Sequence, residues 1–182
     1  MSFDPCWLPS RRADAYFAEL MASVPWEQGT LSFFGKSVPE PRLSAWFGSA
    51  DYVYSGRRVR AREMPPALHE LTRSVELALG QSFNSVLLNL YRDGRDSMGL
   101  HADDEPELGR NPFIASVSLG ATRRFILRPK RGAELAPLSL LLSHGSLLTM
   151  AGACQHVFRH GVPKAPAINE PRINLTFRQT RA

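Results

Sequence analysis

The stretch of this chain with the clearest capacity for chemistry is His101-Ala102-Asp103. Side chains two residues apart point to the same face of an extended strand, so the imidazole and the carboxylate can bind one metal ion together. The tripeptide alone is a weak signal, because most short polar motifs are simply exposed at the surface. Asp104 is the alternative carboxylate, but it faces the opposite side if the backbone is extended.

Two downstream histidines, His156 and His160, could complete the site. They are four residues apart, so both point the same way on a strand. Two imidazoles and one carboxylate leave three adjacent octahedral positions open, which suits Fe(II) that must hold a cosubstrate and dioxygen together. Spacing alone leaves the third ligand open. His160 directly precedes Gly161-Val162-Pro163, near an expected strand end, so we favour it and expect a structural role for His156.

The segment RINLTFR, residues 172–178, alternates polar and apolar side chains, as a strand with two different faces does. Arg172 and Arg178 share the polar face. If that face is open to solvent, the pattern needs no ligand. If it lies inside the fold, the arginines need anions, because an unpaired buried guanidinium is costly. A dicarboxylate such as 2-oxoglutarate would pair with both, and Asn89 and Tyr91 could add neutral hydrogen bonds.

The elements that must position these residues fall into two parts. The first part mixes loops with two helices, one capped by Ser10 and ended by Pro25, the other between Pro66 and Gly80. We expect His69 at the surface of the second helix. Hairpins and loops are expected over residues 30–62. The second part predicts short strands, which favour a sandwich, barrel or jelly roll: SVLLNLY, FIASVSLG, RRFILRP, LSLLLSHGSLLTMAG, CQHVFRHGV and RINLTFRQT. His144 is expected to bond the backbone of a turn.

Bulk properties predict one domain over the 182 residues. No apolar run is long enough to span a bilayer, and MSFDPCWLPS does not read as a secretory signal, so we expect no membrane association. The two cysteines, Cys6 and Cys154, cannot form a disulfide framework, which favours a reducing, cytoplasmic compartment. The net charge of +5 favours a polyanion such as nucleic acid as partner, although solubility alone would explain it.

Five ordered segments together resemble one family: NLYRDGRDSMGLHADDE, IASVSLGATRRFILR, LLSHGSLLTM, HGVPK and RINLTFR. They look like the AlkB-type Fe(II)/2-oxoglutarate dioxygenases that repair alkylated nucleic acid. The likeness covers roughly residues 85–180, is weaker at FFGK and YVYSG, and is closest to the members that act on duplex DNA. It implies an α+β fold, with helices and a nucleotide-recognition lid over about residues 1–84. A double-stranded β-helix, or jelly-roll, core would occupy about residues 85–182.

The resemblance also assigns roles. It selects His160 over His156, so that His101, Asp103 and His160 hold Fe(II), with 2-oxoglutarate and O2 as cosubstrates. Arg172 would pair with the distal carboxylate of 2-oxoglutarate. The family pattern places the remaining cosubstrate contacts as follows: Tyr91 and Asn174 assist Arg172, while Arg178 and Asn89 lie near the end that chelates iron.

Substrate contacts follow from the same likeness. A base must leave the duplex to reach the iron, and Tyr54 would stack on it opposite the ring of His101, with Tyr52 beside the nucleotide. Both tyrosines could instead be core aromatics. Glu105 would accept a hydrogen bond from the exocyclic amine and favour cationic N1-methyladenine or N3-methylcytosine. Phe34 is the expected wedge between bases. Candidate phosphate contacts are Lys36, Arg42, Arg57, Arg58, Arg60 and Arg62.

These features predict a monomeric DNA repair enzyme that oxidatively demethylates N-alkylated bases and releases formaldehyde, succinate and CO2. One alternative keeps the chemistry but acts on RNA, protein or a small molecule. Another is a non-catalytic nucleic-acid-binding module, against which the complete triad and both arginines argue. The spacing after FGK differs from that of close relatives, which leaves open the choice between duplex and single strand and between DNA and RNA.

Overall fold

The structure, a computed structural model, describes residues 1–33, 36–48, 52–54, 57–59 and 62–181, with only the backbone described for 32–33, 36, 52–54 and 57–59. Its helices are α1 (Ser10–Ser23), α2 (Pro66–Leu79), α3 (Cys154–Val157) and the 3-10 turn η1 (Pro106–Leu108). Its strands are β1 (Ser2–Asp4), β2 (Thr30–Phe33), β3 (Lys36–Pro39), β4 (Leu43–Gly48), β5 (Tyr52–Tyr54), β6 (Arg57–Val59), β7 (Ser85–Tyr91), β8 (Met98–His101), β9 (Ile114–Gly120), β10 (Arg123–Pro129), β11 (Leu138–Leu142), β12 (Ser146–Met150), β13 (Phe158–Val162) and β14 (Arg172–Arg178).

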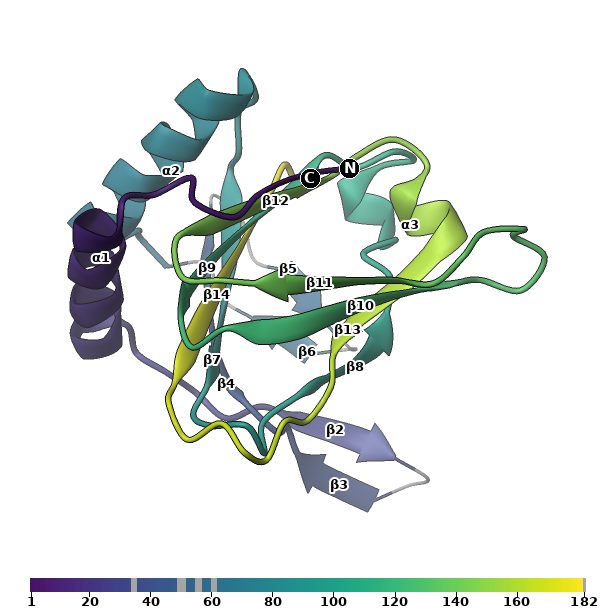
Figure 1. Ribbon diagram of the computed structural model, residues 1–182, viewed down its shortest axis with the longest axis horizontal. Coiled ribbons are helices and arrows are strands. Elements are labelled where there is room, and N and C mark those ends of the chain that lie inside the picture. The colour runs from purple at the N-terminus through teal and green to yellow at the C-terminus, as the bar shows by residue number, and fades with distance from the viewer. Residues whose placement is uncertain (34–35, 49–51, 55–56, 60–61, 182) are drawn as a thin grey trace.

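Two antiparallel sheets form the jelly-roll core. The major sheet has the strand order β1-β12-β9-β14-β7-β4, and the minor sheet the order β11-β10-β13-β8. Helices α1 and α2 lie on one side of the major sheet, and the minor sheet lies on the other (Figure 1). The β2–β3 hairpin projects from one end of the molecule, and β5 pairs with β6 in a separate small ribbon. The predicted α+β class with a jelly-roll core is confirmed.

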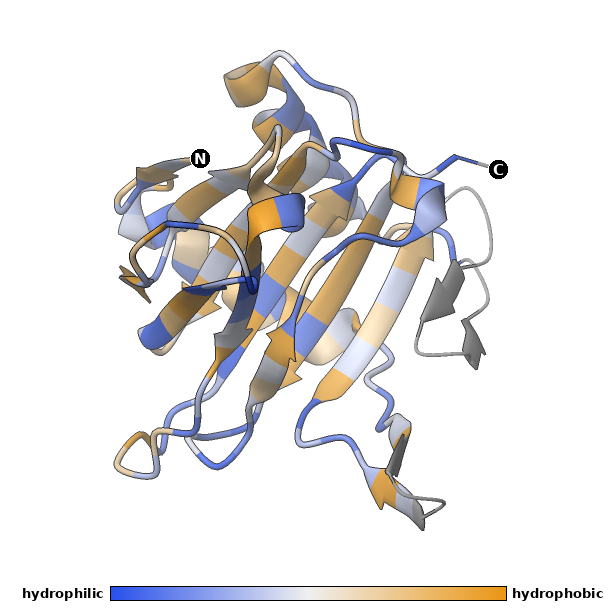
Figure 2. Cartoon of the chain, turned by 90° about the vertical axis from the view of Figure 1, so that its right-hand side faces the viewer, coloured by the Kyte–Doolittle hydropathy of each residue, from blue (hydrophilic) through white to orange (hydrophobic). Residues whose placement is uncertain are grey.

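The central strands of the major sheet are buried on both faces. The alternation of polar and apolar side chains along each strand gives the sheet one apolar and one polar face. In β14, Ile173, Leu175 and Phe177 join the apolar cluster shared with α1 and α2. The polar residues of the same strand therefore face the minor sheet. Figure 2 shows apolar and polar residues alternating along the strands. The arginines of RINLTFR thus lie inside the fold, where Arg172 and Arg178 are both buried.

The helices differ from their prediction at one cap. Pro9, and not Ser10, is the N-cap of α1, and no side chain caps this end. Ser10 is already the first helical residue, since a proline directly before it supplies the extended backbone that a cap requires. Helix α2 ends as predicted, because Gly80 adopts a φ of 62° just past its last residue. Among the described residues, no helix is long and apolar enough to cross a membrane.

Two segments are arranged differently from their prediction. Strands β1 and β4, from the first half of the chain, pair with β12 and β7 in the major sheet, so that half contributes to the core as well as to hairpins. The expected strand CQHVFRHGV begins instead with α3, whose backbone bonds run from Val157 N–H to Ala153 O, and extends only from Phe158. His156 and His160 therefore do not share a strand face.

Candidate metal centre

His101 and His160 stand directly opposite each other on neighbouring strands. His101 is the last residue of β8, and the register of the β8–β13 pair matches it with His160. The two ring centroids lie 4.4 Å apart. Asp103 follows β8 by two residues, and one ligand atom from each of the three side chains lies within 4.8 Å of the others. The sequence prediction of these three residues as one cluster is confirmed.

Gly161 lets the two strands approach this closely. A Cβ atom built at Gly161 would lie 2.8 Å from the carbonyl oxygen of Met98 and 2.9 Å from that of Gly99. Both distances are shorter than real Cβ contacts allow. A larger residue after His160 would push β13 away from β8 and separate the two imidazoles.

Hydrogen bonding fixes which nitrogen of His101 is available. Its Nδ1 lies 3.0 Å from the carbonyl oxygen of Gly99, which can only accept, so Nδ1 carries the proton and donates. The lone pair of Nε2 then faces the site, 3.7 Å from Oδ1 of Asp103. A second hydrogen bond that sets the tautomer of a ligand is the usual arrangement around protein metal ions.

Asp103 is held at both its backbone and its carboxylate. Its backbone N–H donates to Oε1 of Gln155 at 3.0 Å, and its Oδ1 accepts from Nη2 of Arg178 at 2.8 Å. Burial disfavours the charged carboxylate, but the positive charge of Arg178 and its hydrogen bond outweigh burial, so the pKa of Asp103 lies below its usual value. The residue is therefore an anionic ligand in a fixed position.

His160 is kept neutral by its surroundings. Burial, together with the nearby His101, lowers the pKa of His160 to about 4, against the opposing effect of Asp103. Its Nε2 lies 3.7 Å from Oδ2 of Asp103, and the ring of Phe125 packs beside it with a centroid distance of 5.3 Å. A neutral imidazole next to a carboxylate has a free lone pair for a metal ion at neutral pH. Two nitrogens and one oxygen with no thiolate suit Fe(II).

A pocket extends from this cluster between the two sheets. Its polar lining includes the triad and residues of β7, β9 and β14, namely Asn89, Tyr91, Ser116, Asn174, Thr176 and Arg178. Asn174 donates its amide hydrogens to Oγ of Ser116 at 2.9 Å and to the carbonyl of Val117 at 3.2 Å. The amide oxygen of Asn174, and not its NH2 group, is therefore the end that can bind other partners.

Arg172 lies against Tyr91, although it is not itself among the residues that line the pocket. Its Cζ is 5.1 Å from the centroid of the Tyr91 ring, and its Nη2 donates to Oγ of Ser118 at 2.8 Å. Among the described residues, its buried Nε and Nη1 have no hydrogen-bond partner. A buried guanidinium with unused donors fits an anionic ligand such as a carboxylate, whose oxygens can accept from them.

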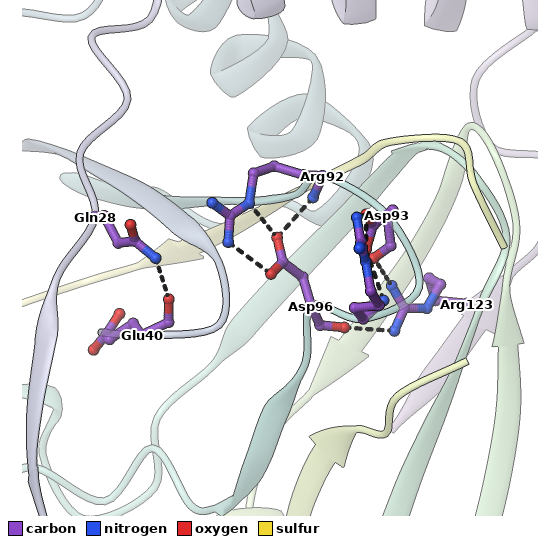
Figure 3. A network of polar contacts seen from close by, with 7 residues as sticks. Gln28, Glu40, Arg92, Asp93, Asp96 and Arg123 are labelled. Atoms are coloured by element: carbon purple, nitrogen blue, oxygen red, sulfur yellow. Dashed lines mark hydrogen bonds and ion pairs between the residues drawn. The ribbon is translucent and has the colours of Figure 1, made fainter. Parts of the chain in front are cut away.

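A network of polar contacts fixes the loop that leads into β8. Arg92 binds Asp96 through two side-chain hydrogen bonds of 2.8 and 2.9 Å. Arg123 donates to the carbonyl oxygens of Asp93, Asp96 and Pro163, and so ties this loop to the one after β13. Figure 3 shows both arginines converging on the loop. Arg123 thereby holds the strands that carry His101 and His160 at their adjoining ends.

The other predicted site residues are placed as follows. Glu105 lines a neighbouring pocket with His156 and Arg110, and not the pocket of the triad. Asp104 is exposed and pairs with Lys130 at 2.9 Å, which agrees with its opposite orientation. His156 is exposed and contacts the carbonyl of Arg110, as a structural residue would.

The remaining histidines match their prediction. His144 Nδ1 accepts a hydrogen bond from the backbone N–H of Gly120 at 2.8 Å, and His69 is exposed on α2.

Several predicted nucleic-acid contacts lie outside the described residues. Phe34 is one, and the side chains of Tyr52 and Tyr54 are not described either. The same holds for four candidate phosphate contacts: Lys36, Arg57, Arg58 and Arg60. Arg42 is described, and its prediction as a phosphate contact is wrong, because the residue is only 3% exposed and pairs with the buried Glu40. Arg62 pairs with Glu27.

Sequence reasoning missed Gln155 and the buried position of Arg42. Gln155 is 1% exposed and binds the backbone of a metal ligand from 52 residues away, which no spacing rule reveals. The pair of opposite charges flanking Pro41, Glu40 and Arg42, was the available signal for an internal ion pair.

A jelly roll with this buried cluster defines the class of protein as a 2OG-Fe(II) oxygenase, in which 2OG denotes 2-oxoglutarate. The family model of the 2OG-Fe(II) oxygenase superfamily matches residues 1–178, and the chain belongs to this superfamily. Within it the chain is an AlkB-like oxygenase. It is 44% identical over 184 residues to the alpha-ketoglutarate-dependent dioxygenase alkB homolog 3 of Bos taurus, with 96% of this chain and 64% of that protein covered. It is 40% identical over 178 residues to the DNA oxidative demethylase ALKBH2 of Homo sapiens, with 92% of this chain and 68% of that protein covered.

The chain thus spans just under two thirds of the length of the first of these relatives. A solved structure, that of OsALKBH1, superposes with a TM-score of 0.67 at 18% sequence identity, covering 98% of this chain and 97% of that one. This likeness shows the fold alone. Identity to alkB homolog 3 is slightly higher than to ALKBH2.

Proposed function

We propose that the protein is an Fe(II)- and 2-oxoglutarate-dependent oxygenase that removes methyl groups from alkylated bases of DNA. The observation that carries the cosubstrate assignment is the buried Arg172, whose Nε and Nη1 have no partner among the described residues, beside a pocket that contains His101, Asp103 and His160. The substrate class is supported by the name of a relative, DNA oxidative demethylase, and by the net charge of +5.

His101, Asp103 and His160 would hold the iron through two neutral imidazoles and one carboxylate. With Fe(II), 2-oxoglutarate and O2 bound, the chemistry places one oxygen atom on the methyl carbon and the other in succinate, with release of CO2, and the hydroxymethyl group then leaves as formaldehyde. Gln155 and Arg178 keep the carboxylate of Asp103 in place.

The cosubstrate would lie between the two sheets, against the polar face of β7 and β14. Arg172 would pair with its distal carboxylate through its unused donors, beside Tyr91. Arg178, which binds Asp103, also lines the pocket together with Asn89, and these two residues would contact the opposite end. Asn174 would act through its oxygen and through its bond to Ser116. The burial of these groups excludes water and strengthens each charge interaction.

Substrate recognition would use the residues that follow the metal ligands and the N-terminal hairpins. Glu105 lines the pocket next to that of the triad, and its Oε2 has no hydrogen-bond partner among the described residues, so it could accept a hydrogen bond from a base amine there. A carboxylate there would also favour the positive charge of N1-methyladenine or N3-methylcytosine over an unmodified base. Tyr54 and Tyr52 would contact the flipped base and nucleotide, and Phe34 would hold the neighbouring bases apart.

A formaldehyde assay tests the proposal directly. Single- and double-stranded DNA and RNA oligonucleotides, matched in sequence and carrying one methylated base, are incubated with Fe(II), 2-oxoglutarate and O2. We expect formaldehyde release from methylated DNA and none from unmodified oligonucleotides. The proposal fails if no oligonucleotide reacts while an amino acid, a protein or a small molecule stimulates succinate production.

A matched pair of histidine variants tests the ligand assignment. His160→Ala should abolish metal-dependent turnover, because it removes one of three protein ligands. His156→Ala should retain most of it, because His156 contacts only the backbone of Arg110 and the side chain of Asn111. The opposite ranking would transfer the third ligand to His156.

A further inference from the structure

A buried ion pair lies behind the pocket, in the short connection between β3 and β4. Glu40 and Arg42 are 4% and 3% exposed, and Oε2 of Glu40 lies 3.0 Å from Nη2 of Arg42. Glu40 is itself confined, since a Cβ atom on Gly29 would lie 3.0 Å from its carboxyl carbon. A buried pair that is packed this closely holds the guanidinium in one place.

Arg42 also binds a residue of the pocket. Its Nε–H donates to Oδ1 of Asn89 at 3.0 Å, and Asn89 lines the pocket that contains the metal ligands. Arginine has donors and no acceptor, so the atom of Asn89 that faces Arg42 must be the amide oxygen. The amide NH2 of Asn89 is therefore the end that remains for other partners.

The residue opposite Asn89 has the reverse orientation. Asn174 is paired with Asn89 in the register of β14 and β7. Because the amide hydrogens of Asn174 are donated to Ser116 and Val117, its oxygen is the end that remains. Of these two facing amides, Asn89 alone can donate to a ligand oxygen.

We propose that Arg42 is a positioning residue for the cosubstrate, which orients Asn89 so that its NH2 group donates to an oxygen of 2-oxoglutarate. This inference rests on the cosubstrate part of the proposed function and adds the reason for the amide orientation. Without the bond to Arg42, the Asn89 amide is free to rotate, and its oxygen would then face the oxygens of the ligand.

Arg42→Lys isolates the bond. Lysine places a methylene where Nε stands and its ammonium close to Glu40, so the ion pair persists and the donor to Asn89 is lost. The matched control is Arg92→Lys, which likewise removes an Nε–H from an ion pair, that with Asp96, outside the pocket. The readouts are the Kd of 2-oxoglutarate for the Mn(II)-loaded protein and the Kd of Mn(II) alone, both by titration calorimetry.

We expect Arg42→Lys to raise the Kd of 2-oxoglutarate about five- to tenfold, the effect of one lost hydrogen bond, and to leave the Kd of Mn(II) unchanged. Arg92→Lys should change neither. Asn89→Leu should weaken binding by a similar factor, and the double variant should be no weaker than Asn89→Leu alone. Asn89→Asp keeps an acceptor for Arg42, so it should fold, and it should bind 2-oxoglutarate more weakly still because an anionic oxygen then faces the ligand.

Wild-type affinity in Arg42→Lys, or effects of the two single variants that multiply in the double variant, would overturn the inference. The same data separate it from the proposed function. If the wild-type protein binds Mn(II) but no 2-oxoglutarate, both fail. If it binds 2-oxoglutarate with the expected variant pattern but demethylates no oligonucleotide, only the substrate assignment fails.

Discussion

Arg172→Met should leave the ligand-free protein at least as stable as the wild type while removing its affinity for 2-oxoglutarate. Arg172 is fully buried, and burial lowers the pKa of its guanidinium to about 10. Because this pKa lies well below the ordinary value and each pKa unit corresponds to about 1.4 kcal/mol, keeping the guanidinium charged in the folded protein costs about 3 kcal/mol. A carboxylate ligand would remove that cost, and a methionine removes it permanently.

The expected size of the effect is smaller than this cost. Methionine loses the hydrogen bond to Ser118 and the contact with the Tyr91 ring, which together offset about 1–2 kcal/mol. The net gain in the free energy of unfolding is then about 1–2 kcal/mol, or a rise in Tm of about 2–8 °C for a chain of this length. The affinity for 2-oxoglutarate should fall by about 100-fold or more, since one partner of a buried charge pair is missing.

Urea unfolding with and without 2-oxoglutarate measures both effects, and Arg123→Met is the matched control. Arg123 is equally buried, but its guanidinium donates to the carbonyl oxygens of Asp93, Asp96 and Pro163. Its replacement would leave those acceptors unpaired and should destabilise the fold. If Arg172→Met destabilises the ligand-free protein as much as Arg123→Met does, then Arg172 is satisfied within the protein and is not reserved for a ligand.

Three further perturbations probe the supports of the site. Gln155→Met should weaken metal affinity by about 10- to 100-fold, because the backbone N–H of Asp103 loses its acceptor; an unchanged Kd in a metal titration would refute this role. In the metal-free protein, the pKa of His160, about 4, lies below its usual value. As pH falls from about 6.5 to 4, the unfolded chain therefore binds a proton at this histidine before the folded protein does. The free energy of unfolding should decrease over that window by up to about 3 kcal/mol. Urea unfolding at several pH values should show a smaller decrease for His160→Asn, and superimposable profiles would contradict the assignment. Gly94→Ala should cost about 3 kcal/mol or more, because its Cβ would lie 1.7 Å from the carbonyl oxygen of Ala165, whereas Gly99→Ala, with open space around it, should melt near the wild-type temperature.

The sequence was sufficient where chemistry depends on local periodicity. The two-residue spacing of His101 and Asp103 placed both ligands at one site, and the alternation in residues 172–178 placed Arg172 and Arg178 on one face. Which face points inward followed from the apolar partners Ile173, Leu175 and Phe177, which pack with the helices. Periodicity therefore determines a shared face whenever the backbone is extended throughout the motif.

Periodicity failed where the backbone left the strand. His156 was placed on a strand with His160, but the chain turns after Gly152, which has a φ of 61°, into a one-turn helix. Periodicity also could not predict contacts that depend on the register between strands distant in the sequence. Arg42 meets Asn89 because β4 pairs with β7 over Leu43 to Gly48, a pairing that no local pattern specifies. A charged residue in the predicted recognition region was therefore assigned to the surface.

The two faces of the major sheet explain why so many polar groups can be buried here. Every residue of β7 and β14 is buried, yet only one face of each strand is polar. The apolar face packs against α1 and α2, and this packing keeps the strands in place although the polar groups on the other face are buried without a ligand. Arg172 is the clearest case, because its neighbours Ile173 and Leu175 fix the backbone while its Nε and Nη1 have no acceptor among the described residues. Mutations in the helix layer should therefore change the stability of the protein more than its affinity for 2-oxoglutarate, as long as the register of β14 on β7 is preserved.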